Sequence, residues 1–71
     1  MQYESIVELL NYATGQEQPV RITTLDRREI VGIPTSVDRE IGAHEVYLHP
    51  IGAEEIEIAV SLTQISRVDI A

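Results

Sequence analysis

The spacing of the apolar residues changes once along this 71-residue chain, and that change limits the folds that the chain can adopt. Before residue 15 the apolar side chains recur every three or four residues, which is the period of an amphipathic helix. They are Ile6, Leu9, Leu10 and Ala13. From Val20 onward they recur at every second residue in short segments separated by turn residues, which is typical of strands. We therefore expect one helix, about residues 3–14, followed only by strands.

Local signals mark the two ends of the expected helix. Ser5 and Glu8 have the S-x-x-E spacing of an N-terminal capping box. Gly15 suits the residue that follows a last helical turn. The polar residues 16–19 end in proline, which is typical of a linker.

Five short strands are expected after the linker, at about residues 20–25, 30–37, 44–49, 55–61 and 65–70. Gly32 and Pro34 predict a bend or bulge in the second strand, because glycine weakens a strand and proline removes a ladder donor. Residues 38–42 are expected to form the next turn. The pattern predicts a mainly β chain of one domain, residues 1–71, in which an N-terminal helix precedes a strongly bent, five-stranded antiparallel small barrel of the SH3 type.

Size and composition favour self-association. The chain has no cysteine, so it has no disulfide and no thiol cluster for zinc. Small domains without such staples often gain stability by oligomerising, since one small core supplies only about 3–5 kcal/mol.

The charge is strongly acidic, with twelve Asp and Glu residues against five arginines and a net charge of −7. Affinity for nucleic acid comes mostly from neutralised phosphates, so this balance excludes a broad cationic face. No apolar run approaches the length of a membrane span, and the start of the chain lacks the basic and apolar regions of a signal peptide. We therefore expect a cytoplasmic protein with no membrane partner.

The titratable residues do not predict an active site. His44 and His49 are an odd number of residues apart on one expected strand, so they face opposite sides and form no joint metal site in one subunit. Glu55 and Glu57 share an expected strand face, which alternation with Ile56 and Ile58 explains as a solvated surface. Without a nucleophile, base and orienting group, we expect no enzyme activity, no cofactor and no metal.

The aromatic residues have two interpretations. They are Tyr3, Tyr12 and Tyr47, and a tyrosine ring could stack on a nucleic-acid base. A half-buried packing role with a bonded hydroxyl is commoner, and we favour it here.

Two stretches resemble motifs of a known family. In the first, Gly32 lies six residues before Asp38 on a bent second strand. In the second, residues 60–68 contain a strand end, a tight connector and a final strand. Together with the N-terminal helix, this layout resembles the Sm/LSm family of small β-barrels, which includes the Hfq-like proteins. The resemblance covers nearly the whole chain and implies an Sm-like barrel.

The chain departs from that family at the positions where the resemblance places RNA contacts. Gly42 stands where the family usually has a base-contacting asparagine, and Glu40 stands where a stacking side chain is expected. Ser61 and Leu62 stand where the family commonly has Arg-Gly. The resemblance therefore implies the scaffold without its usual uridine pocket.

The resemblance also implies a ring, in which strand four of one subunit pairs with strand five of the next. The apolar side chains expected in the core beneath this seam are Ile56, Ile58, Val60, Ile65, Val68 and Ile70. We therefore expect a homo-oligomer, as the size of the chain also favours.

Two hypotheses for the function remain open. The first is a non-catalytic, ring-forming module that associates with RNA through an altered surface, as the resemblance implies. The second is an oligomeric scaffold for protein interactions that does not bind RNA, which the acidic charge favours. The candidate contacts for either partner are Arg27, Arg28, Arg39, Glu40, Gly42, Ser61 and Leu62.

Overall fold

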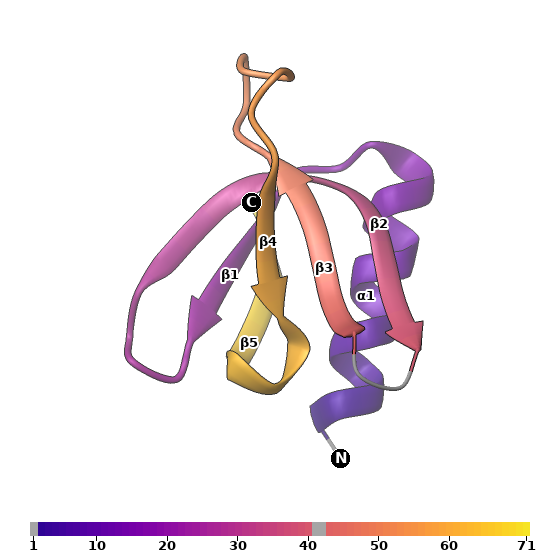
Figure 1. Ribbon diagram of the computed structural model, residues 1–71, viewed down its shortest axis with the longest axis vertical. Helices are drawn as coiled ribbons and strands as arrows, with labels where there is room; N and C mark the ends of the chain where they lie inside the picture. The colour runs from indigo at the N-terminus through magenta and orange to yellow at the C-terminus, as the bar shows by residue number, and fades with distance from the viewer. Residues whose placement is uncertain (1, 41–42) are drawn as a thin grey trace.

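The computed structural model describes the backbone of residues 2–40 and 43–71 and the side chains of residues 5–40 and 44–71. Its elements are α1 (Gln2–Gln16), β1 (Val20–Thr24), β2 (Glu29–Glu40), β3 (Ala43–His49), β4 (Ile58–Ser61), the 3-10 helix η1 (Leu62–Gln64) and β5 (Ile65–Ile70). The strands form one bent antiparallel sheet in the order β4-β3-β2-β1-β5, with α1 packed beside it (Figure 1). The expected mainly β fold, one helix followed by five antiparallel strands, is confirmed.

The core lies between the sheet and one face of α1. The helix contributes buried side chains at the spacing that predicted it, and the strands contribute the rest. The buried apolar residues are Ile6, Val7, Leu10, Ala13, Val20, Ile22, Val46, Leu48, Val60, Leu62 and Ile65. No helix in the described part of the chain is both long and apolar enough to cross a bilayer.

The ends of α1 differ from the prediction. The helix already includes Gln2, so Ser5 lies inside it and the proposed capping box is wrong. Gly15 also lies inside the helix, and Glu17 takes the left-handed conformation with φ 53° instead. The amide of Gln18 donates to the Ala13 carbonyl at 2.9 Å, which is the bond that closes a Schellman motif. A glutamate thus occupies the position that glycine usually fills.

Gly32 marks the point where β2 passes from one half of the sheet to the other. Val20 of β1 pairs with Gly32, and His49 of β3 pairs with the next residue, Ile33. A Cβ atom on Gly32 would lie 2.5 Å from the His49 carbonyl oxygen, so only glycine fits at this bend.

Pro34 is accommodated by a β-bulge. It is fully buried and pairs with Leu48, and the register then shifts before Ser36, so that Thr35 has no partner in the ladder. The Thr35 hydroxyl donates to the Tyr47 carbonyl at 3.1 Å. The predicted bend or bulge in the second strand is therefore confirmed.

The predicted turn at residues 38–42 is wrong over its first three residues. Asp38, Arg39 and Glu40 continue β2 and pair with Glu45, His44 and Ala43 of β3. Charged residues resemble a turn in the sequence, but here they form the end of a two-stranded ribbon, where the ladder bonds satisfy the backbone. Ile41 and Gly42 lie outside the described residues.

The fourth strand starts later than predicted. It begins at Ile58, and Ile56 lies before it with 49 % of its surface exposed. Pro50 and Gly52, which has a φ of 83°, end the partner strand β3 at His49, so residues 55–57 have no strand to pair with. The predicted strand face shared by Glu55 and Glu57, and the core position of Ile56, are therefore wrong.

Candidate functional site

The candidate partner contacts lie at one end of the sheet. The β1–β2 turn, the end of β2 and the junction of β4 with η1 are at the lower end of the molecule in Figure 1. Glu45 of β3 pairs with Asp38 on one side and with Ser61 on the other. The Leu25 amide donates to the Gln64 carbonyl at 2.8 Å and so ties the β1–β2 turn to η1. Apart from Gly42, which is not described, all the candidate contacts lie at this end.

The candidate contacts differ in what they offer to a partner. Arg39 and Glu40 are exposed, and the Ser61 hydroxyl is hydrogen-bonded to that of Thr63 at 2.9 Å. Leu62 is only 2 % exposed, so its side chain belongs to the core. Among the described candidate contacts, the groups available to a partner are therefore polar or charged.

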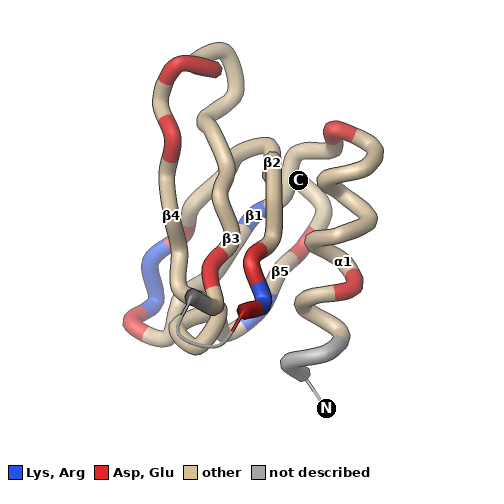
Figure 2. Tube along the Cα trace, turned by 45° about the vertical axis from the view of Figure 1, so that its right-hand side comes forward, with Lys and Arg blue, Asp and Glu red and all other residues tan. Residues whose placement is uncertain are grey.

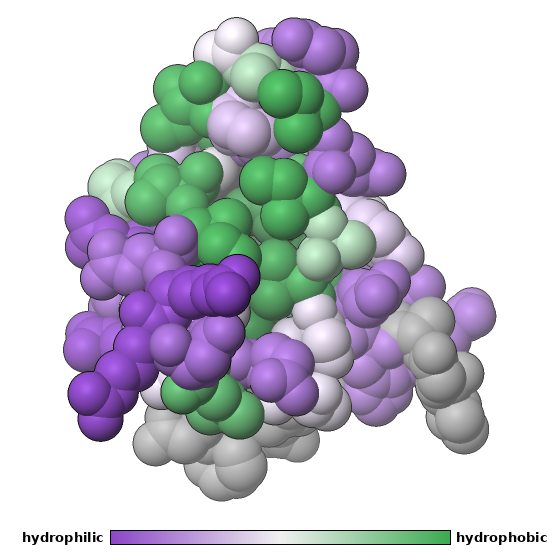
Figure 3. All heavy atoms as spheres, turned by 60° about the vertical axis from the view of Figure 1, so that its left-hand side comes forward, coloured by the Kyte–Doolittle hydropathy of each residue, from purple (hydrophilic) through white to green (hydrophobic). Residues whose placement is uncertain are grey.

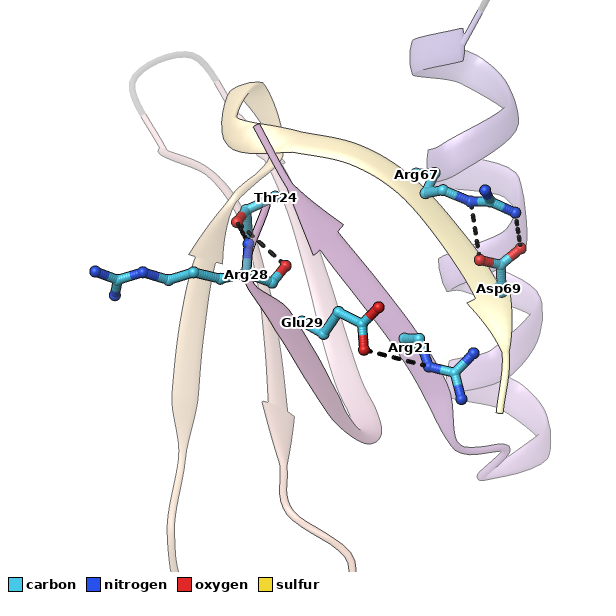
Figure 4. A network of polar contacts seen from close by, with 6 residues as sticks. All are labelled: Arg21, Thr24, Arg28, Glu29, Arg67 and Asp69. Carbon is cyan, nitrogen blue, oxygen red and sulfur yellow. Dashed lines mark hydrogen bonds and ion pairs between the residues drawn. The ribbon is translucent and has the colours of Figure 1, made fainter. Parts of the chain in front are cut away.

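Three of the five arginines are paired with carboxylates. Arg28 lies 3.2 Å from Asp26, Arg21 lies 4.0 Å from Glu29, and Arg67 lies 3.0 Å from Asp69. Figure 4 shows the second of these pairs bridging β1 and β2 and the third lying along β5. Exposed pairs of this kind add little to stability, but they neutralise cations that phosphate could otherwise use.

Neighbouring groups shift the pKa values of Asp26 and Arg67. The Thr24 hydroxyl donates to the carboxylate of Asp26, and this bond, together with the charge of Arg28, lowers the pKa of Asp26. The hydrogen bond from Arg67 to Asp69 raises the pKa of Arg67 in the same way. Both shifts favour the charged forms, that is the Asp26 carboxylate and the Arg67 guanidinium.

Arg27 and Arg39 form no ion pair with any described carboxylate. Arg27 lies at the β1–β2 turn with a φ of 70°, and its amide donates to the Thr24 carbonyl. Arg39 lines a hollow of about 210 Å³ beside α1, together with Glu8 and Asn11. Figure 2 shows the cations of the turn and of β2 at the same end of the molecule.

The histidines and the described tyrosines differ in their surroundings. His44 and His49 lie on β3 an odd number of residues apart, and the described residues contain no group of three metal ligands. The Tyr47 hydroxyl donates to Glu45 at 2.8 Å, and this bond and the charge of Glu45 raise the pKa of Tyr47. The packing interpretation is confirmed for the half-buried Tyr47 and is wrong for Tyr12, which is 59 % exposed. The side chain of Tyr3 is not described.

The two end strands of the sheet carry most of the predicted seam residues. Val60 and Ile65 are buried, Ile58 and Val68 are half-buried, and Ile70 is 45 % exposed. Beside β4 a hollow of about 310 Å³ is lined by apolar residues of β2 and β4 and by polar residues of the β1–β2 turn. Figure 3 shows apolar side chains gathered in one strip on this side of the molecule.

Among solved structures, the chain is similar to the crystal structure of the pleiotropic translational regulator Hfq, with a TM-score of 0.73. The match covers 92% of this chain and 88% of that one, at 15% sequence identity. This chain has the Sm-like fold. No protein-family model matches the sequence, and a search of curated proteins found no match.

The backbone of this fold explains the glycine of the first motif. Gly32 is required because the His49 carbonyl approaches it closely, whatever partner the surface binds. At the level of identity found, the likeness concerns the fold alone, so the properties of the surface must be argued from this chain's own side chains.

Sequence reasoning missed a third hollow in this Sm-like fold, with a volume of about 300 Å³. It lies between the C-terminal end of α1, the β2 bulge and the β3–β4 loop, and Glu17, Pro34 and Glu54 are among its lining residues. These segments are far apart in the sequence, so no local sequence motif could predict the site. Pro34, a proline inside an expected strand, was the one local signal.

Proposed function

We propose that this chain is a non-catalytic Sm-like subunit that assembles into a closed ring and associates with RNA. The RNA would bind at the end of the molecule that carries Arg27 and Arg39, which we call the arginine-bearing end. The observation that supports the ring is the order of the sheet, because β4 and β5 are its two end strands. In the described part of the chain each of them pairs on one side only.

Pairing between copies would satisfy both edges at once. Open strand edges with apolar neighbours promote uncontrolled association, and a closed ring removes them. If β4 of one copy pairs with β5 of the next and the rotation between copies closes, every copy uses both edges and the ring has no free end. Ile58, Val68 and Ile70, which the single subunit leaves partly exposed, would be covered by this contact.

The RNA-binding part of the proposal rests on Arg27 and Arg39. Neither is neutralised by a described carboxylate, and a ring would repeat both in every subunit. The likeness to a translational regulator points to the same class of ligand. With a net charge of −7 per chain, we expect binding that is weak and strongly dependent on salt.

Sedimentation velocity combined with a salt series of oligo-U and oligo-A binding tests both parts. We expect a homo-oligomer and an affinity that falls as salt rises, and Arg39→Gln or Arg27→Gln should each reduce the slope by about one counterion. Arg21→Gln is the matched control, because Arg21 is already paired with Glu29. A monomer at micromolar concentration would rule out the ring, and an equal effect of Arg21→Gln would rule out the assigned RNA contacts.

A protein-interaction scaffold is the second candidate. It is favoured by the three arginine–carboxylate pairs, which leave few cations for phosphate. The same experiment separates the two functions, since a ring that binds neither oligonucleotide at low salt would support the scaffold.

A further inference from the structure

The hollow at the C-terminal end of α1 is distinct from the arginine-bearing end of the molecule. Its volume of about 300 Å³ is at the lower limit for sites that hold small ligands or single side chains. Its lining includes the apolar residues Ile33 and Pro34 of β2 and the carboxylates Glu17 and Glu54. Figures 1 and 2 show that the end of α1 and the β3–β4 loop lie at the end opposite the β1–β2 turn.

The two carboxylates and the helix end around this hollow favour a cation. Glu17 and Glu54 approach it from different elements, the linker after α1 and the β3–β4 loop. The last turn of α1 contains no basic residue, so the negative end of the helix dipole is not compensated there. His49 also lines the hollow, and its Nδ1 donates to the Pro50 carbonyl at 3.0 Å.

Two residues of the hollow are poor choices for the local structure. Glu17 places a negative charge at the negative end of a helix and holds a left-handed backbone that disfavours side chains. Pro34 lies inside a strand and requires a bulge. Natural sequences break such local rules mainly at sites of function, and here both exceptions line one cavity.

We propose that this hollow binds the guanidinium side chain of an arginine in a peptide segment of a partner protein. Arginine fits better than a compact cation, because its aliphatic stem can lie against the half-buried Ile33 while its N–H groups donate to carboxylates on two sides. The site does not depend on the ring or on RNA, so it goes beyond the proposed function.

An NMR titration of the whole protein with the peptide acetyl-Gly-Arg-Gly-amide tests the site. We expect weak binding, in about the millimolar range, with amide shift changes at Glu17, Thr35 and His49. The same peptide with citrulline, which has the shape of arginine without its charge, should cause none of these changes. Glu54→Gln should weaken binding about tenfold, since hydrogen bonds to charged groups are the strong ones.

Glu17→Gly separates this role from a structural one. Glycine suits the left-handed position, so we expect a higher melting temperature together with about tenfold weaker peptide binding. Glu57→Gln is the matched control, because Glu57 belongs to the same loop but does not line the hollow. Equal loss of binding in Glu57→Gln, equal binding of the citrulline peptide, or shift changes confined to the arginine-bearing end would overturn the proposal. Amide spectra of the unliganded variants establish that each one is folded.

Discussion

At the scale of single residues, Gly32 is a position where the fold does not accommodate a side chain. In Gly32→Ala the added Cβ would meet the His49 carbonyl oxygen at 2.5 Å and the Leu48 Cδ1 atom at 3.1 Å. Since one of these is a backbone atom, β2 and β3 would have to move apart. We expect a loss of about 2–4 kcal/mol in the free energy of unfolding, measured by urea denaturation. A loss below about 1 kcal/mol would show that the strands can separate without cost.

Gly15→Ala should stabilise the folded protein, whereas Gly32→Ala should destabilise it. Nothing lies within 4 Å of the position of its Cβ, and Gly15 is inside α1. Alanine should therefore raise the free energy of unfolding by about 0.5–1 kcal/mol, because glycine has more backbone entropy to lose. Thermal denaturation followed by circular dichroism would measure this, and a lower melting temperature would contradict it.

The lowered pKa of Asp26 predicts how the stability of the protein changes at acidic pH. Its pKa is lowered below 3.8 in the folded protein, so its contribution is fully present above that value and is lost as the pH falls through the folded pKa. Asp26→Asn should therefore lower the urea midpoint at about pH 6, and this effect should shrink as the pH falls below 3.8. Glu55→Gln is the control, and a pH-independent effect of Asp26→Asn would refute the linkage.

At the scale of elements, the side-chain alternation of β3 places Glu45 and Tyr47 on one face. The hydrogen bond between them and the charge of Glu45 hold the pKa of Tyr47 above its usual value of 10.0. A raised pKa means that stability is present below the unfolded value and is lost as the pH rises through the folded one. Glu45→Gln should lower the pKa of Tyr47 and reduce this alkaline loss.

The measurement is a tyrosinate absorbance titration, with Tyr47→Phe supplying the background of the other tyrosines. If Glu45→Gln left the titration of Tyr47 where it was, the carboxylate would not be the cause of the shift.

Periodicity predicted which elements form better than it predicted where they end. The helix and all five strands could be expected from side-chain spacing, because burial on one face imposes that spacing. The start of β4 could not, because Glu55 to Glu57 alternate like a strand and lack only a partner, which Pro50 removes by ending β3. The charged end of β2 was missed for the converse reason, since Arg39 gains a partner that no local pattern reveals.

The candidate site was predictable only in part. The arginine pairs within a turn or along one strand could be guessed from spacing, whereas the freedom of Arg27 and Arg39 from described carboxylates needs coordinates. The cavity beside Glu17 joins segments that meet only in the folded chain. Burial of Leu62 likewise depends on where η1 turns back onto the core.

At the scale of the whole molecule, assembly should depend on β5 more than on the exposed loop. Ile70→Lys places a charge at the proposed seam, and because Ile70 is 45 % exposed the subunit itself should stay folded. We expect sedimentation velocity to show a shift toward smaller species, by at least about a tenfold weakening of association. Ile51→Lys is the matched control, since Ile51 is 60 % exposed in the β3–β4 loop. An unchanged assembly in Ile70→Lys would place the seam elsewhere.

The position of β1 between β2 and β5 also sets the order in which the sheet can be completed during synthesis. Val20 can pair with Gly32 on one side soon after both have left the ribosome, but its other neighbour, Ile70, belongs to β5, which is made after the other strands of this sheet. Contacts between distant residues close slowly, because a long loop must be ordered first. The nascent chain therefore carries an incomplete sheet with an unpaired side of β1 until β5 arrives, and in that interval it depends most on protection from other strands.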